Sequence, residues 1–327
     1  MKHQILALAV AALSFTACTN EDNISQDYLA DTPIKLNVSV DEPTTRAGYS
    51  NTELPEEFLL AVEHYLDPDN KKPDNKYSYQ VWAKKVGDGW KTYKPDETLK
   101  GGTDEEVTML WANMNDKVDV TAFTNLGNIT IPTDQTSEVQ LKQADVLYMP
   151  YTKYPPTNKG ITVNLQHAMS KINLTIELGS EFEFTEDINK KITDVKIDGS
   201  LVSGISTPDG IKDEFGDPTP ISPFRTGTTP YSKTNGVITK ASATYEAILI
   251  PQDIASGNFT VSFKVDGKLY EWTYNKDLTL DPSTAYTLKL IAGDDKVQPA
   301  SFSAAKWNPG NGETVKRRKP IKGKKPN

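Results

Sequence analysis

The only cysteine of the 327-residue chain, Cys18, lies in the sequence context that most clearly specifies chemistry. It directly follows the apolar segment from Ile5 to Ala17, which begins shortly after Lys2. A basic start, an apolar run too short to span a bilayer and a small residue at the cleavage point are typical of a signal peptide. A thiol at that point predicts a thioether-linked lipid carrying acyl chains such as palmitate, and two or three chains anchor a protein durably. We therefore expect residues 1–17 to be a lipoprotein signal peptide; the alternative is an ordinary secretory signal with a coincidental cysteine.

The rest of the sequence offers no motif for catalysis or metal binding. It contains no phosphate-binding glycine loop, no Gly-x-Ser-x-Gly turn and no His-Glu-x-x-His pair. A lone cysteine excludes an internal disulfide, and the three histidines are scattered. The segment from Asp67 begins like a calcium loop, but Lys72 occupies the position that needs glycine. His167 is expected to be a structural residue bonded to backbone at a strand bend. We expect neither enzymatic activity nor a metal or cofactor.

Charge is distributed unevenly along the chain. The net charge is −8, yet the chain from Lys316 onward carries seven basic residues and no acidic one, so the remainder is strongly acidic. An acidic body does not favour nucleic-acid binding, and no nucleic-acid partner is expected. The basic tail is either a solvated end or a contact for an acidic neighbour or for lipid phosphates.

Short segments of alternating apolar and polar residues, separated by glycine and proline turns, dominate the chain. This alternation is typical of strands with one buried face. The clearest case places four apolar side chains on one face: Ile34, Leu36, Val38 and Val40. Further strands are expected at residues 58–64, 77–84, 117–123, 138–141, 161–165, 171–178, 192–197, 244–250, 258–265, 268–274 and 285–290. Many short strands at this spacing predict an all-β protein built of β-sandwiches.

The length left after the signal favours two domains. Pro, Lys and Gly gather at residues 154–160, and we place the boundary there, with sandwiches at 47–158 and 159–296. A second irregular stretch, residues 203–233, is expected to be a surface excursion. The Asp266-Gly267 pair between two alternating segments predicts a tight hairpin.

Three segments, in order along the chain, carry a family resemblance. His167-Ala168-Met169-Ser170-Lys171 resembles the His-Ala-Leu-Ser/Ala-Lys signature of the fimbrillin-like proteins of Bacteroidetes. Residues 247–252 and 285–290 are similar to the family's Leu-Ile-Pro-Gln strand end and closing strand. Residues 19–23 resemble the acidic export tag of Bacteroidetes surface lipoproteins. The resemblance implies a type V pilus subunit with two tandem transthyretin-like Greek-key β-sandwich domains. It also implies export as a lipoprotein to the surface of the outer membrane.

The segment Thr45-Arg46-Ala47-Gly48 resembles the arginine processing site of these pilins. The resemblance implies that an arginine-specific protease cuts between Arg46 and Ala47, which makes residues 18–46 a pro-segment. Its four apolar side chains can occupy a sheet edge, worth roughly 6–12 kcal/mol as an upper bound. Once emptied, such a groove would accept a strand from another subunit. The alternative for Arg46 is an ordinary loop arginine.

We expect the donated strand at residues 297–307, in the C-terminal segment 297–327 that also contains the basic tail. Phe302 and Ala304 share one face, and Trp307 continues it after a one-residue shift between Ala304 and Ala305, as a bulge requires. The alternative is that residues 297–307 form the last strand of the second domain.

Together these patterns predict a non-enzymatic structural subunit of surface fimbriae that supports adhesion. Its expected partners are other fimbrial subunits, the arginine-specific protease and, before processing, the outer membrane. Two alternatives stay open: a carbohydrate-binding surface lipoprotein in which exposed Trp and Tyr stack on sugars, and a surface glycosidase, which no motif supports.

Overall fold

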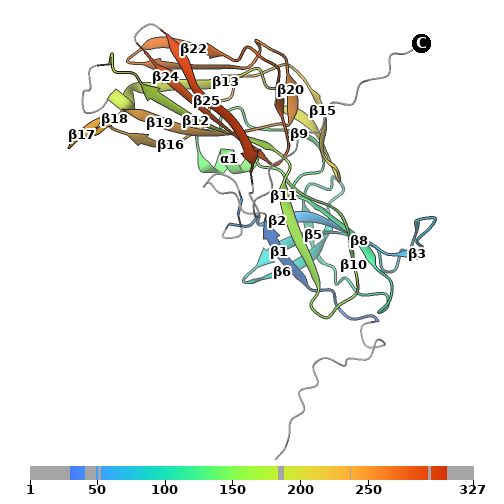
Figure 1. The fold of residues 1–327 in the computed structure, drawn as a ribbon. Helices are drawn as coiled ribbons and strands as arrows, with labels where there is room; N and C mark the ends of the chain where they lie inside the picture. The colour runs from blue at the N-terminus through green and yellow to red at the C-terminus, as the bar shows by residue number, and fades with distance from the viewer. Residues whose placement is uncertain are drawn as a thin grey trace, which may run out of the picture.

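The alternating segments of the sequence form strands in the computed structural model, which describes residues 30–40, 49–50, 53–182, 188–235, 237–293 and 296–307. The strands gather into two lobes, the first at the bottom and the second at the top of Figure 1. Each lobe encloses its own large apolar core. The prediction of an all-β sandwich protein is confirmed.

The first lobe is built on one eight-stranded sheet, ordered β1-β11-β10-β8-β2-β5-β6-β7. The edge strand β1 also contacts β6, so the sheet curls over and encloses a core that includes Phe58, Val120 and Trp111. The strands of this sheet are β1 (Leu36–Val40), β2 (Glu57–Glu63), β5 (Tyr79–Val86), β6 (Gly89–Pro95), β7 (Gly102–Glu106), β8 (Val118–Phe123), β10 (Leu147–Tyr154) and β11 (Ile161–His167).

The second lobe packs a five-stranded sheet, β16-β19-β12-β24-β25, against a three-stranded sheet, β13-β21-β22. Burial alternates residue by residue along β21 and, from Ile172 onward, along β12, as expected for strands that face a core on one side. The bounds are β12 (Ser170–Leu178), β13 (Ile192–Asp198), β16 (Phe224–Thr229), β19 (Ser242–Leu249), β21 (Thr260–Val265), β22 (Lys268–Thr273), β24 (Thr284–Ala292) and β25 (Val297–Lys306).

Smaller elements complete both lobes. β9 (Gly127–Thr130) leaves the first lobe and pairs with β14 (Ser203–Thr207), which also pairs with β15 (Gly210–Phe215). The remaining elements are the hairpins β3 (Tyr65–Asp67) with β4 (Lys72–Pro73) and β17 (Ser232–Thr234) with β18 (Val237–Thr239), the pair β20 (Gln252–Ile254) with β23 (Leu278–Leu280), and the 3₁₀ helix η2 (Ile188–Lys191).

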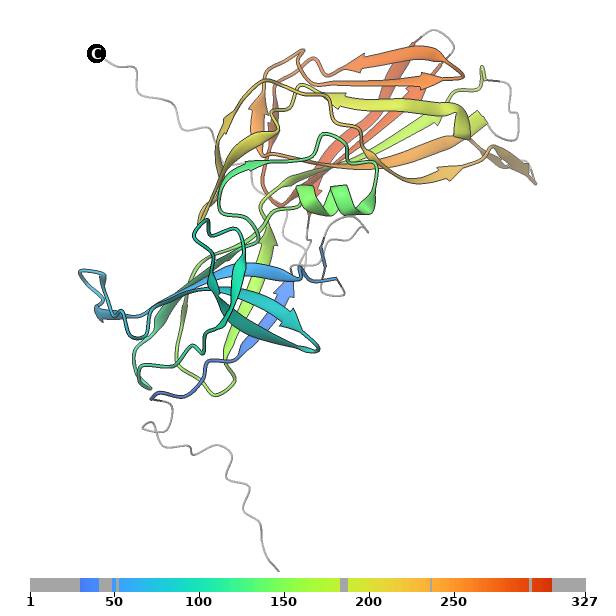
Figure 2. The same ribbon diagram turned by 180° about the vertical axis from the view of Figure 1, so that it is seen from behind.

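The strand expected at residues 138–141 is wrong, because this segment belongs to the helix α1 (Glu138–Ala144). Ser137 caps the helix: its hydroxyl accepts a hydrogen bond from the backbone N–H of Gln140, 3.3 Å away. The helix packs beneath the second lobe, against β19, as Figure 2 shows from behind. Leu141 and Ala144 are buried in the core of that lobe.

The expected hairpin, the expected surface excursion and the expected domain boundary can each be compared with the structure. Asp266 and Gly267 join β21 to β22 with positive φ angles of 49° and 85°, which confirms the tight hairpin. The stretch 203–233 holds the strands β14, β15 and β16 rather than an irregular excursion. β11 belongs to the sheet of the first lobe, so sheet membership changes after His167 and not at the expected boundary of 158/159.

Candidate functional site

The edge strand β1, which contains most of the apolar face singled out in the sequence, pairs in parallel with β11. The register runs from Leu36 opposite Ile161 to Val40 opposite Leu165. β11 is held on its other side by β10, whereas β1 has a single ladder neighbour in the sheet. A strand in that position can leave without breaking the pairing of any other two strands of the sheet.

Gly160 allows β1 to approach this closely. Its φ is +83°, a conformation that favours glycine, and a Cβ atom there would lie only 2.3 Å from the carbonyl oxygen of Lys35. That carbonyl accepts a hydrogen bond from the N–H of Ile161 at 2.8 Å. Nearby, the amide of Asn37 donates to the carbonyl of Lys159 at 2.9 Å. The chain before β11 is therefore shaped to receive the backbone of this particular strand.

The residues just before β1 pair with a different segment of the lobe. The N–H of Asp31 donates to the carbonyl of Trp111 at 2.9 Å, and the N–H of Trp111 donates to the carbonyl of Thr32 at 3.0 Å. The N–H of Ile34 donates to the carbonyl of Met109 at 2.8 Å. The N-terminal segment is thus held on two sides, and its loss would leave backbone groups without partners on both.

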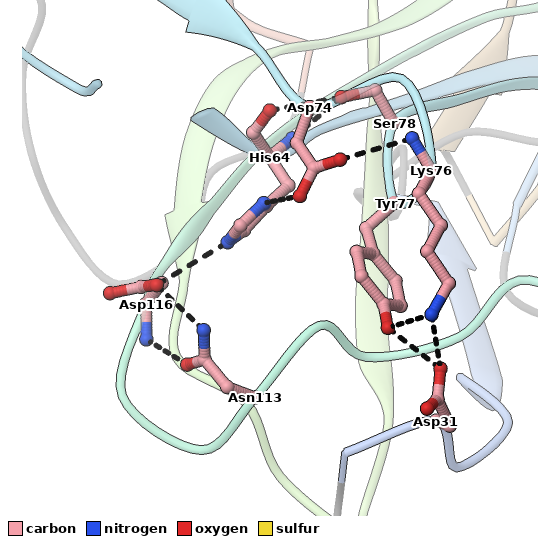
Figure 3. Close-up of polar contacts among 8 residues, drawn as sticks. All are labelled: Asp31, His64, Asp74, Lys76, Tyr77, Ser78, Asn113 and Asp116. Carbon is pink, nitrogen blue, oxygen red and sulfur yellow. Dashed lines mark hydrogen bonds and ion pairs between the residues drawn. The ribbon is translucent and has the colours of Figure 1, made fainter. Parts of the chain in front are cut away.

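An acidic side chain fastens the start of this segment, as Figure 3 shows. Asp31 accepts hydrogen bonds from the hydroxyl of Tyr77 at 2.7 Å and from the ammonium of Lys76 at 3.2 Å. The hydrogen bond from Tyr77 and then that from Lys76 lower the pKa of Asp31. Because the ion pair is exposed, it positions the segment and adds little stability.

His64 joins the two loops beside this anchor (Figure 3). Its Nδ1 lies 3.2 Å from Oδ2 of Asp74, and its Nε2 lies 3.5 Å from Oδ2 of Asp116. Asp74 belongs to the turn that carries Lys76 and Tyr77, and Asp116 lies in the loop that precedes β8. The buried imidazole thus links the two loops that hold the segment's first residues.

The four apolar residues of the expected pro-strand are buried to different degrees. Ile34 and Val40 are buried in the core of the first lobe, whereas Leu36 and Val38 are half-buried against it. The two buried side chains stabilise the seated segment by about 3–6 kcal/mol, and the half-buried pair adds less. We call the groove of the first lobe that holds residues 31–40 the seat of the N-terminal strand. The seat is apolar as expected, but it binds the segment less strongly than it would if all four side chains were fully buried.

The expected lipidation residue Cys18 and the processing residues Arg46 and Ala47 lie outside the described residues. The next described residue is Tyr49, and its backbone N–H donates a hydrogen bond to Oδ2 of Asp145 at 2.9 Å. The residues that follow the expected cut are therefore bonded to a buried carboxylate at the junction of the lobes, and Tyr49 packs against the core of the first lobe.

Of the C-terminal residues expected to form a donor strand, Phe302 and Ala304 lie in β25 and Trp307 directly follows it. β25 is the edge strand of the second lobe's larger sheet and is antiparallel to β24. Phe302 is half-buried and packs edge-on against Tyr274, Ala304 is exposed, and Trp307 is buried. The expected irregularity between Ala304 and Ala305 is wrong, because the register shift lies opposite Lys289 and Leu290. Donation to a neighbour stays a prediction.

Sequence reasoning missed a buried cluster where the lobes meet. Nδ1 of His167 lies 2.9 Å from Oδ1 of Asp145, a carboxylate rather than the expected backbone partner. The imidazole stacks on the indole of Trp307, with ring centres 4.1 Å apart. Lys171, fully buried, forms an ion pair of 3.1 Å with Glu246, and burial lowers the pKa of Lys171 against the opposing effect of that carboxylate. The signature residues thus surround Trp307, just after β25: His167 stacks on its ring and bonds Asp145, and Nζ of Lys171 lies 5.5 Å from its ring centre.

Neither a metal centre nor a membrane-spanning helix is found in the described part of the chain. Within those residues, no group of three or more His, Cys, Asp or Glu side chains is arranged to hold a metal ion. No helix there combines the length and apolar character needed to cross a bilayer.

The fold and the two-sided seat define a β-sandwich protein with an N-terminal edge strand embedded in its first lobe. The sequence model of the fimbrillin-like family matches residues 78–307, so the chain belongs to that family. A candidate cell adhesion protein from Bacteroides ovatus has a similar structure, with a TM-score of 0.56 and 16% identity over 84% of this chain and 97% of that one. A second, from Bacteroides uniformis, has a TM-score of 0.50 and 13% identity over 84% and 98%. No curated protein matches by sequence. Family membership supports a role as a fimbrial subunit at the cell surface.

Proposed function

We propose that this chain is a structural subunit of surface fimbriae that assembles by exchanging its N-terminal strand for a strand of a neighbouring subunit. The observation that carries the proposal is the seat of β1. An edge strand fills part of the first lobe's core with Ile34 and Val40, and Arg46 follows a few residues later along the chain.

Cleavage between Arg46 and Ala47 would turn a covalently attached strand into a noncovalent ligand of the lobe. Tyr49, on the far side of the cut, would keep its hydrogen bond to Asp145 and its packing against the core of the first lobe, so the new N-terminus would stay attached. Loss of the strand would expose the edge of β11 and apolar core surface, which is unfavourable in water. A strand from a neighbour restores both the ladder hydrogen bonds and the burial.

The donor in this proposal is β25, whose side chains are mostly exposed and whose outer edge has no ladder partner among the described strands. Transfer would bring Phe302, Ala304 and Trp307 to positions that Ile34, Leu36, Val38 and Val40 occupy in the uncleaved chain. Phe302 and Trp307 supply the large apolar side chains for that exchange.

The proposal also includes the route to the surface. A lipid on Cys18 would hold the uncleaved subunit on the outer membrane, and cleavage at Arg46 would release it from that anchor into the fimbrium. Its partners would be other subunits and an arginine-specific protease, and the protein would carry out no reaction itself.

The test is to treat the purified uncleaved chain, its Arg46→Ala variant and its Arg46→Lys variant with an arginine-specific protease. The unmodified chain should lose its N-terminal segment and form polymer ladders on native gels, and both variants should stay monomeric. Arg46→Lys keeps the positive charge, so it separates recognition of arginine from an effect of charge. Ladders from Arg46→Ala equal to those of the unmodified chain would exclude cleavage at this position as the trigger.

A further inference from the structure

We propose that a cavity on the outer side of the first sheet binds one sugar ring of a glycan. The cavity has a volume of about 200 Å³ and is lined by Trp82 of β5, by the turn between β6 and β7, and by the segment from β8 to β9. That volume is smaller than the roughly 300–1,000 Å³ of pockets that take drug-sized ligands, so it suits a single ring.

The cavity is separate from the seat of the N-terminal strand. Trp82 packs with Leu59 and Phe123 in a small apolar cluster, whereas Ile34 and Val40 pack in the main core of the lobe. Ligand binding here therefore does not require removal or exchange of β1, and the uncleaved chain contains the complete site.

One wall of the cavity is fixed by a single carboxylate. Oδ1 of Asp96 accepts hydrogen bonds from the N–H of Thr98 at 2.9 Å, from its hydroxyl at 2.7 Å and from the N–H of Lys100 at 3.2 Å. These bonds hold Leu99 at a φ of 57°, and both Leu99 and Lys100 line the cavity. The wall is preformed, which reduces the entropy lost on binding.

The opposite wall is tied to both lobes. The N–H of Thr124 donates to the carbonyl of Leu147 at 2.9 Å, and the hydroxyl of Ser206 donates to the carbonyl of Asn125 at 2.6 Å. Further along, β9 pairs with β14 of the second lobe. The side chains of this wall therefore stand on backbone that is hydrogen-bonded on both sides.

The residues that line the cavity match a sugar better than a metal cation, and they include one cationic side chain, Lys100. The polar residues Asn125, Asn128 and Thr130 line the cavity together with the apolar residues Leu99 and Leu126, and the hydroxyl of Thr130 lies 2.9 Å from that of Ser203. A pyranose ring likewise combines hydroxyl groups with apolar C–H faces. None of the lining residues, all of them described, carries a carboxylate, which argues against a metal cation.

A buried donor beside the cavity lacks an acceptor. The indole N–H of Trp82 is buried and has no hydrogen-bond partner among the described residues, an unusual state for a buried polar group. Gly102 lies against this residue, since a Cβ atom there would be 2.8 Å from Cβ and 3.0 Å from Cδ1 of Trp82. Because Trp82 also lines the cavity, its indole N–H is a reporter group for a ligand that enters there.

The experiment is titration of the uncleaved, ¹⁵N-labelled chain with the methyl glycosides of glucose, galactose, mannose and N-acetylglucosamine, followed by indole N–H signals in NMR spectra. Trp82→Phe assigns the Trp82 signal by its disappearance. At least one glycoside should shift that signal saturably, with a dissociation constant on the order of 1 mM, and leave the other indoles unchanged. Asn125→Ala and Asn128→Ala should each weaken binding about three- to tenfold, since each removes hydrogen bonds to the ligand.

Asn258→Ala provides the matched control, because Asn258 is an exposed asparagine of the second lobe outside the cavity. It should leave the affinity unchanged. The proposal is overturned if no glycoside shifts the Trp82 signal, if only acetate or inorganic phosphate does, or if Asn258→Ala weakens binding as much as Asn128→Ala. If Trp82→Phe does not fold, saturation-transfer signals from the glycosides, compared between the unmodified chain and Asn128→Ala, decide the same question. Since all measurements use the uncleaved monomer, failure here leaves the proposal of strand exchange intact.

Discussion

Replacement of Gly160 by alanine should loosen the N-terminal strand selectively. Alanine at this position meets two obstacles: the positive φ of +83° and a Cβ atom 2.3 Å from the carbonyl oxygen of Lys35. The second obstacle exists only while the segment before β1 is seated. Gly257→Ala is the matched control, because Gly257 has a similar φ of +87° and no atom within 4 Å of the added Cβ.

The size of the effect follows from what must move. The positive φ costs alanine about 1–2 kcal/mol at either position. At Gly160 the carbonyl of Lys35 must also withdraw, which breaks its hydrogen bond to Ile161 and disturbs the burial of Ile34. A lost backbone hydrogen bond and part of one aliphatic side chain's burial add about 2–4 kcal/mol. This extra cost should raise the opening constant of the strand about 30- to 700-fold.

Native-state hydrogen exchange, read at the amides of residues 34–40, measures that opening directly. Exchange there should accelerate in Gly160→Ala by the stated factor and stay close to that of the unmodified chain in Gly257→Ala. After cleavage at Arg46, the Gly160→Ala variant should also release the N-terminal peptide that contains β1 faster than the unmodified chain does. Equal exchange rates at residues 34–40 in the two alanine variants would show that Lys35 and Gly160 do not control the seating of β1, and the reasoning would fail.

Four further outcomes are expected. Lys171→Met should destabilise the fold by about 3 kcal/mol in urea unfolding, because it leaves Glu246 buried without its partner, and the additional change Glu246→Leu should restore most of that loss. Burial lowers the pKa of Lys171, so the folded chain binds fewer protons than the unfolded chain between that pKa and 10.5; the free energy of unfolding should rise with pH across this window, and Lys171→Met should abolish the rise. Phe302→Asp should leave the monomer folded by circular dichroism yet reduce polymer length after cleavage, and polymers of normal length would exclude β25 as the donor. Cys18→Ala should remove labelling by an alkyne fatty acid, whereas undiminished labelling would place the lipid elsewhere.

Local patterns were enough to locate most strands. The alternation around Leu36 and Val38 and the Asp266-Gly267 turn each specify a local structure through side-chain spacing or backbone conformation, and the structure agrees at both places. The strand prediction for residues 138–141 was wrong because two apolar positions in a four-residue window fit a strand and a helix equally well. The Ser137-x-x-Gln140 capping pattern was present in the sequence and was the signal that could have decided for the helix.

The domain boundary and the buried cluster could not be derived in the same way, because both depend on contacts between distant segments. The irregular residues at 154–160 mark a turn between neighbouring strands of one sheet, β10 and β11, and composition alone does not separate such a turn from a linker. The hydrogen bond of His167 to Asp145 and its stacking on Trp307 join segments that are far apart in the sequence and meet only in the folded protein. A lone histidine in a strand gives no indication of such partners.

The position of Trp307 also constrains how the proposed donor strand could work. Most side chains of β25 are exposed, so its attachment to the second lobe rests on the ladder with β24, on Phe302 and on Trp307. Withdrawal would unstack Trp307 from His167 and open a buried junction that also contains Asp145. Exchange is then favourable only where a neighbour's emptied seat returns both the ladder hydrogen bonds and the apolar burial. A subunit whose own β1 is still seated offers neither, and this makes cleavage a physical precondition for polymerisation in the proposed mechanism.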